Sequence, residues 1–227
     1  MNHGTHNAVG DGVWEGLRLH DDVLVFLDAN EMYDGVHVRL ILTRGIKKTP
    51  SQDPRLTISG PNLVIIAEHK QADPKSRERG ITLFTSSIRR GSPDYLDPRL
   101  NCHSKLHEVQ ALIQALQAGA DEALMLDIHG FVATCNATNF FMVKNNEAWT
   151  STGQYCMNGI TRGKIIAACH KHGIPCAEKN FSLFGGLTPV TAIDGRDIGP
   201  YGPITKKLQA YYDEAVHRAV NAARPSR

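Results

Sequence analysis

Short runs of β-forming residues, each bounded by Gly, Pro or charged turn residues, set the first constraint on the fold of this chain. Polar segments that contain proline separate the runs, which is typical of surface loops. We therefore expect the runs to form one sheet, followed by a linker at residues 91–98. Three such runs occur before the linker, at residues 36–43, 63–69 and 81–86.

Helical and strand patterns mix after the linker. Apolar residues recur at helical spacing over residues 106–116, which predicts a helix with one buried stripe that can end at Gly119. Similar spacing predicts helices over 160–172 and 204–219. Four β-rich runs joined by turns lie between the first two helices and predict an antiparallel meander: ALMLDI, FVATC, TNFFMVK and EAWT.

The order of these elements predicts an α+β fold in two layers. The linker places a domain boundary near residue 95, so that residues 1–95 form a small N-terminal domain and residues 96–227 form a larger one. A chain of 227 residues is long enough to bury a core without disulfides or metals to support it.

Charge and cysteine content exclude several classes of function. The 25 basic and 23 acidic residues leave a net charge of +2, too small to indicate nucleic acid or an anionic membrane as a partner. Five cysteines without a CxxC pair are typical of reduced thiols. No apolar run approaches the roughly 20 residues that span a bilayer, and the N-terminus lacks the pattern of a signal peptide. We therefore expect a cytoplasmic protein that binds small molecules or protein.

Residues 157–163, MNGITRG, lead from a glycine-containing turn directly into a helix. Helix N-termini bind phosphate because free amide donors coincide with the positive end of the helix dipole, and Thr161 adds a hydroxyl group. The pattern therefore indicates an anion site. The alternative is an ordinary helix start that Asn158 or Thr161 caps.

Lys105 stands at the start of the expected helix over 106–116, among short polar residues. A lysine held in a partly desolvated pocket is nucleophilic enough to form a Schiff base with an aldehyde. Because lysine is seldom buried, the alternative is a solvated residue at a helix end.

Several stretches, by their order and spacing, resemble the class IV pyridoxal-phosphate-dependent aminotransferases, the group that contains branched-chain and D-amino-acid aminotransferases and aminodeoxychorismate lyase. The resemblance implies fold type IV, with a small N-terminal α/β sandwich and a larger C-terminal β-rich domain with helices. It also implies a pyridoxal 5'-phosphate cofactor and a homodimer. The matching stretches span nearly the whole chain: GDGVWEGLR (10–18), HVRLILTRG (37–45), LDPRL (96–100), AGADEALMLD (118–127), GFVATCNATNFFMV (130–143), NGITRG (158–163), LTPV (187–190) and GPITKKLQ (202–209).

The resemblance also implies roles for single residues. Lys105 would form the Schiff base and carry protons, and the backbone of Ile160 and Thr161 would bind the cofactor phosphate. Trp14 falls where the family has an aromatic wall of the substrate pocket, and Arg39 falls where some members hold the substrate carboxylate. The alternatives are a tryptophan of the core and a solvated arginine.

Three departures from the family pattern bear on activity. Counted without gaps, the family's lysine position falls on Asn101, one helical turn before Lys105. Thr134 stands where the family has a glutamate that faces the pyridine nitrogen, so a protonated ring is less favoured. Two segments that supply phosphate contacts in the family, one before NEMYDG and one before FGGLTPV, are missing, and their loss weakens cofactor binding.

The expected function is therefore transamination of a small, branched-chain or other aliphatic, amino acid with a 2-oxo acid through a Lys105 Schiff base. Two alternatives stay open: a catalytically impaired homologue that acts as a binding or regulatory subunit, and a lyase of the aminodeoxychorismate type. A metal is not expected, because one cysteine and histidine cluster lacks zinc-finger spacing and is better explained as helix-end residues: Cys169, His170, His172 and Cys176.

Overall fold

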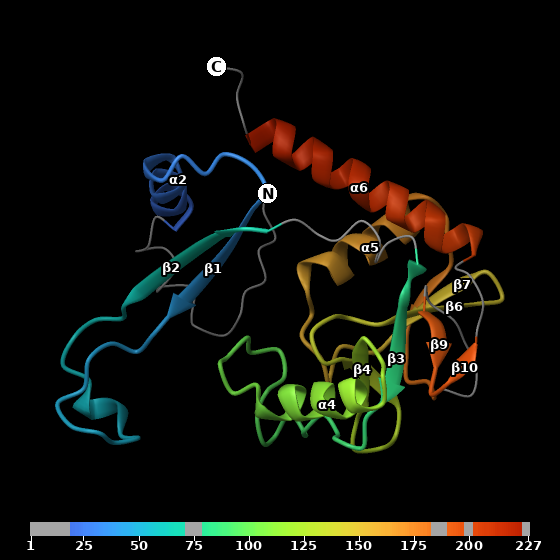
Figure 1. The fold of residues 1–227 in the computed structure, drawn as a ribbon, viewed down its shortest axis with the longest axis horizontal. Helices are drawn as coiled ribbons and strands as arrows, with labels where there is room; N and C mark the ends of the chain where they lie inside the picture. The colour runs from blue at the N-terminus through green and yellow to red at the C-terminus, as the bar shows by residue number, and fades with distance from the viewer. Residues whose placement is uncertain (1–18, 71–78, 183–189, 198–201, 224–227) are drawn as a thin grey trace. The chain divides into compact units, whose positions relative to one another are not determined.

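A computed structural model describes residues 19–70, 79–182, 190–197 and 202–223 and shows a mixed α+β chain (Figure 1). The chain divides into two compact units. Residues 10–74 form the smaller unit, and residues 75–227 form the larger one together with residues 1–9. Within the described ranges, no helix is both long and apolar enough to cross a membrane.

The smaller unit is built on one antiparallel hairpin. Strands β1 and β2 pair along their whole length, and Arg39 lies opposite Ile66. Positions on β2 alternate between half-buried and exposed from Leu63 to Ala67, as expected for a sheet with one solvated face. The elements of this unit are α2 (Leu19–Ala29), β1 (Val36–Leu42), the 3-10 turn η1 (Pro54–Leu56) and β2 (Leu63–His69).

The described residues of the larger unit form two sheets and the helices that pack on them. The first sheet has the order β10-β9-β3-β4-β5, in which β3 runs parallel to both of its neighbours. The second sheet has the order β6-β7-β8. The elements are β3 (Ile81–Thr85), α4 (Leu106–Gln117), β4 (Glu122–Leu126), β5 (Val132–Cys135), β6 (Phe141–Lys144), β7 (Glu147–Thr150), α5 (Ile160–Lys171), β8 (Cys176–Glu178), β9 (Val190–Ile193), β10 (Arg196–Asp197) and α6 (Pro203–Ala223).

Strand β3 corrects the expectation that the first three β-rich runs form one sheet. It pairs with β4 and β9 in the larger unit, and two aspartates fix it there. Asp121 accepts hydrogen bonds from the backbone N–H and hydroxyl of Thr82, at 2.8 and 2.9 Å, and Asp194 does the same for Thr85. Among the described residues, β2 therefore belongs to the smaller unit and β3 to the larger one. The domain boundary near residue 95 stays a prediction.

The expected meander forms as two separate hairpins. Strands β4 and β5 pair in the first sheet, whereas β6 and β7 pair in the second, so the chain changes sheet after Cys135. The turn between β6 and β7 has positive φ at Asn145 and Asn146, 50° and 62°, which is the conformation of a tight hairpin turn.

Helix α4 covers β3 and β4 through its small residues (Figure 1). Ala111 and Ala115 are fully buried against Ala123 and Met125, so the helix lies close to the sheet. The predicted buried stripe is therefore wrong for four of its five residues, because these large aliphatic side chains lie on the opposite face of the helix, whereas the fifth, Leu112, is half-buried. The four are Leu106, Val109, Ile113 and Leu116, and each is 48% exposed or more.

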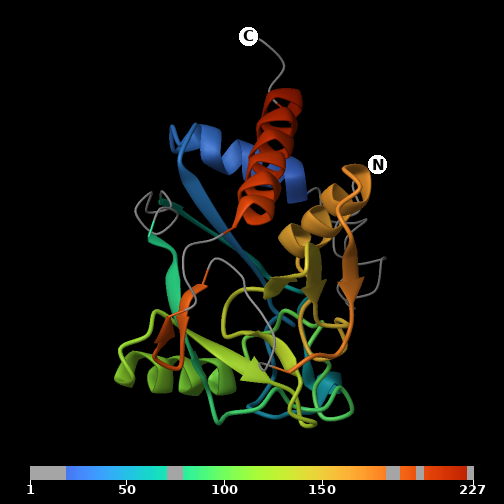
Figure 2. The ribbon, with the colours of Figure 1, turned by 90° about the vertical axis from the view of Figure 1, so that its right-hand side faces the viewer.

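Helices α5 and α6 lie side by side and pack on the second sheet (Figure 2). Cys169 of α5 and Leu208 of α6 meet Ala148 of β7 in one apolar cluster. Another cluster joins Leu124 and Phe140 with Phe181. The apolar packing of the larger unit therefore includes residues from before and after the turn that follows β5.

Candidate functional site

A cavity of about 350 Å³ opens in the larger unit between the start of α4 and the end of β5. We call it the polar cavity, because hydrogen-bonding side chains from both elements face it. Its walls come from the residues before α4, the first turns of α4, the end of β5 and the turn that follows. The lining residues are Arg90, Pro98, Asn101, Lys105, Glu108, Val109, Leu112, Thr134, Cys135, Asn136, Ala137, Thr138, Asn139 and Met157.

Lys105 immediately precedes α4, at its N-cap. Its side chain is 44% exposed, and Nζ lies 3.7 Å from Oε1 of Glu108 on the first turn of the helix. Asn101 lines the same cavity. The structure thus brings both candidate positions for the family's lysine to one cavity, and Lys105 is the one of the two that carries an amine.

Glu108 is the centre of a buried charge cluster in the cavity wall. Its Oε1 accepts a hydrogen bond from Arg90 Nη1 at 2.7 Å. His107 Nδ1 lies 3.1 Å from Oε2 without hydrogen-bond alignment, and Oε2 has no hydrogen-bond partner among the described residues. A buried acceptor of this kind is costly, so it is available for an N–H or O–H group of a ligand.

The surroundings of His107 lower its pKa and so favour its neutral form. Burial lowers its pKa; the charge of Glu108 opposes this shift, and the charges of Arg90 and Lys105 add to it. A neutral imidazole can accept a hydrogen bond, and Arg90 Nη1 lies 3.1 Å from His107 Nε2. The cluster therefore orients Arg90 from two sides.

Thr134 is buried on β5 and faces the polar cavity. Its hydroxyl donates to the carbonyl oxygen of Thr138 at 2.8 Å, so its proton is committed within the fold. Only its lone pairs remain to accept a hydrogen bond from a ligand, and a hydroxyl is a weaker acceptor than a carboxylate.

Asn139 ties the start of α5 to the polar cavity. Its Nδ2 donates to the carbonyl oxygen of Met157 at 2.8 Å. A Cβ atom at Gly159 would lie 2.6 Å from Asn139 Oδ1, so a side chain there would displace the Asn139 amide or the helix start. The turn into α5 is consequently held against a residue that lines the cavity.

The free N–H groups of the first turn of α5 follow directly after this contact. Ile160 is 57% exposed. The hydroxyl of Thr161 lies 3.2 Å from that of Tyr212 on α6, and Thr161 lines a neighbouring apolar cavity. The amide donors predicted from the sequence are present, but the hydroxyl of Thr161 is shared with α6.

The side chain of Arg162 binds neighbouring elements and does not take part in the anion site at the N-terminus of α5. It is buried, and its Nη2 donates to the carbonyl oxygen of Ser151 at 2.7 Å and to Glu178 at 2.5 Å. The arginine of the motif therefore fastens α5 to the end of β7 and to β8.

Two predicted site residues remain, Arg39 and Trp14. Arg39 is exposed on β1 in the smaller unit, and Trp14 lies outside the described residues. Sequence reasoning missed Arg90, Glu108 and Asn139. Only Glu108 could have been found from the sequence, because it lies at helical spacing from the buried alanines of α4. Nothing in the local sequence distinguishes Arg90 from Arg89.

The cysteine and histidine cluster of α5 is part of the packing. Cys169 is fully buried, and His172 stacks on Tyr211 of α6 with ring centroids 3.6 Å apart. Across the described part of the chain, no group of three or more His, Cys, Asp or Glu side chains is placed to hold a metal ion.

A family model described as amino-transferase class IV matches residues 17–184. Branched-chain-amino-acid aminotransferase-like protein 2 of Arabidopsis thaliana is 33% identical over 252 residues, which cover 89% of this chain and 45% of that protein. The putative branched-chain-amino-acid aminotransferase of Methanocaldococcus jannaschii is 32% identical over 254 residues, with 90% and 87% covered. The chain thus spans less than half of the plant relative and most of the archaeal one.

A solved structure confirms the predicted fold class. The T.th. branched-chain amino acid aminotransferase complexed with N-(5'-phosphopyridoxyl)-L-glutamate is 25% identical and aligns with a TM-score of 0.77, covering 87% of this chain and 69% of that one. The alignment with the plant relative is longer than the 227 residues of this chain. It must therefore contain gaps, in agreement with the internal segments predicted to be missing.

Proposed function

The chain belongs to the class IV aminotransferases, and we propose that it binds pyridoxal 5'-phosphate in the polar cavity and exchanges amino groups between a small aliphatic amino acid and a 2-oxo acid. One observation carries the proposal. Lys105, Thr134 and Asn139 come from different parts of the chain and line one cavity, and Asn139 is bound to the turn from which α5 starts.

The residues at the polar cavity fit the chemical groups of this cofactor. Lys105 offers a primary amine to the aldehyde, and the first N–H groups of α5 offer an anion site for the phosphate. Thr134 has lone pairs for the ring N–H. When bound, the cofactor supplies an electron-withdrawing ring that stabilises negative charge at the substrate Cα. Lys105 would move the proton at Cα, and Glu108 would orient its ammonium group.

We propose the identity of the amino donor from the proteins that this chain resembles. The Arabidopsis and Methanocaldococcus relatives are named as branched-chain aminotransferases or similar proteins, and the T.th. enzyme was complexed with a phosphopyridoxyl derivative of L-glutamate. These relatives support a branched-chain or other small aliphatic amino acid as donor and a 2-oxo acid as acceptor. A cytoplasmic location stays a prediction.

Cofactor uptake by the purified protein tests the proposal. We expect added pyridoxal 5'-phosphate to give a yellow protein with a new absorption band, and borohydride to fix the cofactor to the peptide that contains Lys105. Leucine and 2-oxoglutarate should then exchange amino groups. A protein that stays colourless and carries no label after borohydride would contradict cofactor binding, and release of pyruvate from aminodeoxychorismate would favour the lyase alternative.

The second candidate function is that of a binding or regulatory subunit without amino transfer. Two features favour it: the family's lysine position falls on Asn101 when the sequence is counted without gaps, and the hydroxyl proton of Thr134 is committed to Thr138. In that case the protein would take up the cofactor, or pair with an intact relative, without measurable exchange. Exchange activity that disappears when Lys105 is replaced would exclude this candidate.

We also propose a homodimer, supported by the exposed aliphatic face of α4. Four large side chains on one face of a helix form an apolar stripe that a soluble monomer seldom leaves in water. We expect Ile113→Glu to shift the protein toward the monomer in analytical ultracentrifugation, by at least about tenfold in the dissociation constant. Exposed Ile128, on the turn between β4 and β5, provides the matched control, and Ile128→Glu should leave the dimer intact. An equal response of both variants would place the interface elsewhere.

A further inference from the structure

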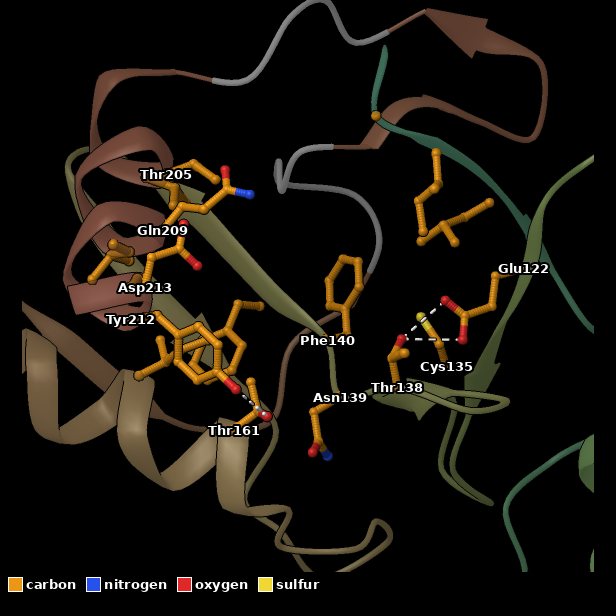
Figure 3. Close-up of a pocket in the computed structure, with 18 residues that line it drawn as sticks. Glu122, Cys135, Thr138, Asn139, Phe140, Thr161, Thr205, Gln209, Tyr212 and Asp213 are labelled. Atoms are coloured by element: carbon orange, nitrogen blue, oxygen red, sulfur yellow. Dashed lines mark hydrogen bonds between the residues drawn. The ribbon is translucent and has the colours of Figure 1, made fainter. Parts of the chain in front are cut away.

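A second cavity, of about 440 Å³, lies in the larger unit between the strands and helices α5 and α6 (Figure 3). We call it the apolar cavity. Phe140 points into it, and Leu83, Ile165 and Leu208 add apolar walls. Its size falls in the range of small-molecule sites. Cys135, Thr138 and Asn139 line both cavities, so the two sites share a wall.

The charged groups of the apolar cavity carry one sign. Among its described lining residues the ionisable acids are Glu122 and Asp213, on opposite sides of the cavity in Figure 3, and no Lys, Arg or His belongs to the lining. In a partly desolvated space such walls repel an anion and attract a cation. A ligand with a free carboxylate or phosphate is therefore disfavoured.

Glu122 has hydrogen-bonding capacity left for a ligand. The hydroxyl of Thr138 lies within hydrogen-bond distance of both carboxylate oxygens, at 3.1 Å from Oε1 and 2.9 Å from Oε2, and Oε1 also accepts from the N–H of Ala137 at 3.2 Å. An ionised carboxylate offers about four acceptor positions, so Oε2 keeps capacity for one more donor. Burial raises the pKa of Glu122; hydrogen bonds from Thr138 and Ala137 oppose this shift, and the described lining of the cavity offers no cation to pair with the carboxylate. An ammonium group would supply the missing partner.

We propose that the apolar cavity binds a hydrophobic primary amine whose ammonium group pairs with Glu122 and whose ring or branched chain packs against Phe140, Ile165 and Leu208. An amino acid fits less well, because its carboxylate would meet no cation in the described wall. The site is therefore separate from the amino acid and 2-oxo acid sites of the proposed function. Thr161 lines this cavity, so the cavity extends to the first turn of α5.

Three naphthalene probes that differ only in their polar group test this site. The cation is 1-naphthylmethylamine, the neutral analogue is 1-naphthalenemethanol and the anion is 1-naphthaleneacetate. Binding to the purified full chain, without pyridoxal 5'-phosphate, is followed by isothermal titration and probe fluorescence. We expect saturable binding of one amine per chain, with the anion at least about tenfold weaker.

Two substitutions locate the site. Glu122→Gln keeps the shape of the side chain and should weaken the amine by at least about tenfold while the alcohol binds as before. Unchanged alcohol binding also shows that the variant is folded. Ile165→Trp should fill the cavity and abolish binding of all three probes, whereas Ile128→Trp, the same change at the exposed turn between β4 and β5, should leave binding unaltered.

Several results would overturn the proposal: no saturable binding of the amine, equal affinity for the amine and the anion, a Glu122→Gln variant with unchanged amine affinity, or an Ile165→Trp variant that still binds. These outcomes are independent of cofactor uptake and of amino transfer, because the cofactor is omitted and no residue assigned to carry it is changed. Failure of this site and failure of the proposed function are therefore distinguishable.

Discussion

The Lys105→Ala protein is expected to stay colourless with added pyridoxal 5'-phosphate and to take up no label after borohydride. Amino transfer should fall by at least about a thousandfold, because both the attachment of the cofactor and the proton movement at the substrate depend on this amine. Lys105→Arg keeps the positive charge near Glu108, 3.7 Å away in the structure, but cannot attach the cofactor. It should therefore lose activity equally while it keeps the stability of the wild type.

The matched control is Lys164→Ala, which removes an exposed lysine of α5 and should change neither colour nor rate. A labelled peptide in Lys105→Ala, or a wild-type label at another lysine, would contradict the assignment. The double variant Asn101→Lys with Lys105→Ala distinguishes two cases. Either the family's lysine position corresponds to Asn101 and the rest of the site binds the cofactor, or the site cannot bind it at all. Because Asn101 lines the same cavity, a lysine there should regain the label if the rest of the site is intact.

Helices and strands with a clear apolar periodicity could be predicted from the sequence, but the elements on which they pack or with which they pair could not. Helices α4 and α5 begin and end close to the predicted residues, because apolar spacing and terminal glycines are local signals. The sheet partners of β3 depend on Asp121 and Asp194, which lie far along the chain from it. Strand pairing of this kind is a long-range property that a run of β-forming residues does not encode.

The orientation of α4 illustrates the same limit. Its aliphatic stripe is the stronger apolar signal, yet the helix packs through Ala111 and Ala115. Small residues allow a closer approach to the sheet, and the sequence alone does not tell which of two faces meets the core and which meets a partner. Periodicity therefore predicted the helix correctly and its buried face wrongly.

The candidate site divides in a similar way. The start of α5 was predicted from the chemistry of helix N-termini and Thr134 from the family pattern, whereas both indicated Lys105. The structure places Lys105 and Thr134 on one cavity. Arg90 and Glu108 belong to no motif. Their importance comes from burial and from each other, since a buried charge is tolerated only when its partner is present.

Breaking this pair should produce the largest loss of stability in the larger unit. Arg90 and Glu108 are 7% and 9% exposed in their side chains, and 2.7 Å separates Nη1 from Oε1. Glu108→Gln leaves the arginine charge buried without its counter-ion, and we expect the free energy of unfolding to fall by about 3 to 5 kcal/mol. Arg90→Met strands the carboxylate instead and should cost a similar amount. Urea unfolding followed by circular dichroism measures both.

The double variant Arg90→Met with Glu108→Leu decides whether the loss comes from an uncompensated charge or from lost packing. If an unpaired charge is the cause, the double variant should be more stable than either single one, because an apolar pair of similar volume carries no desolvation cost. Asp97 and Arg99 form an exposed ion pair at 2.7 Å, and Arg99→Met should cost less than about 1 kcal/mol. Additive losses in the double variant would mean that Arg90 acts mainly through its bond to the carbonyl oxygen of Tyr155, 3.2 Å from Nε.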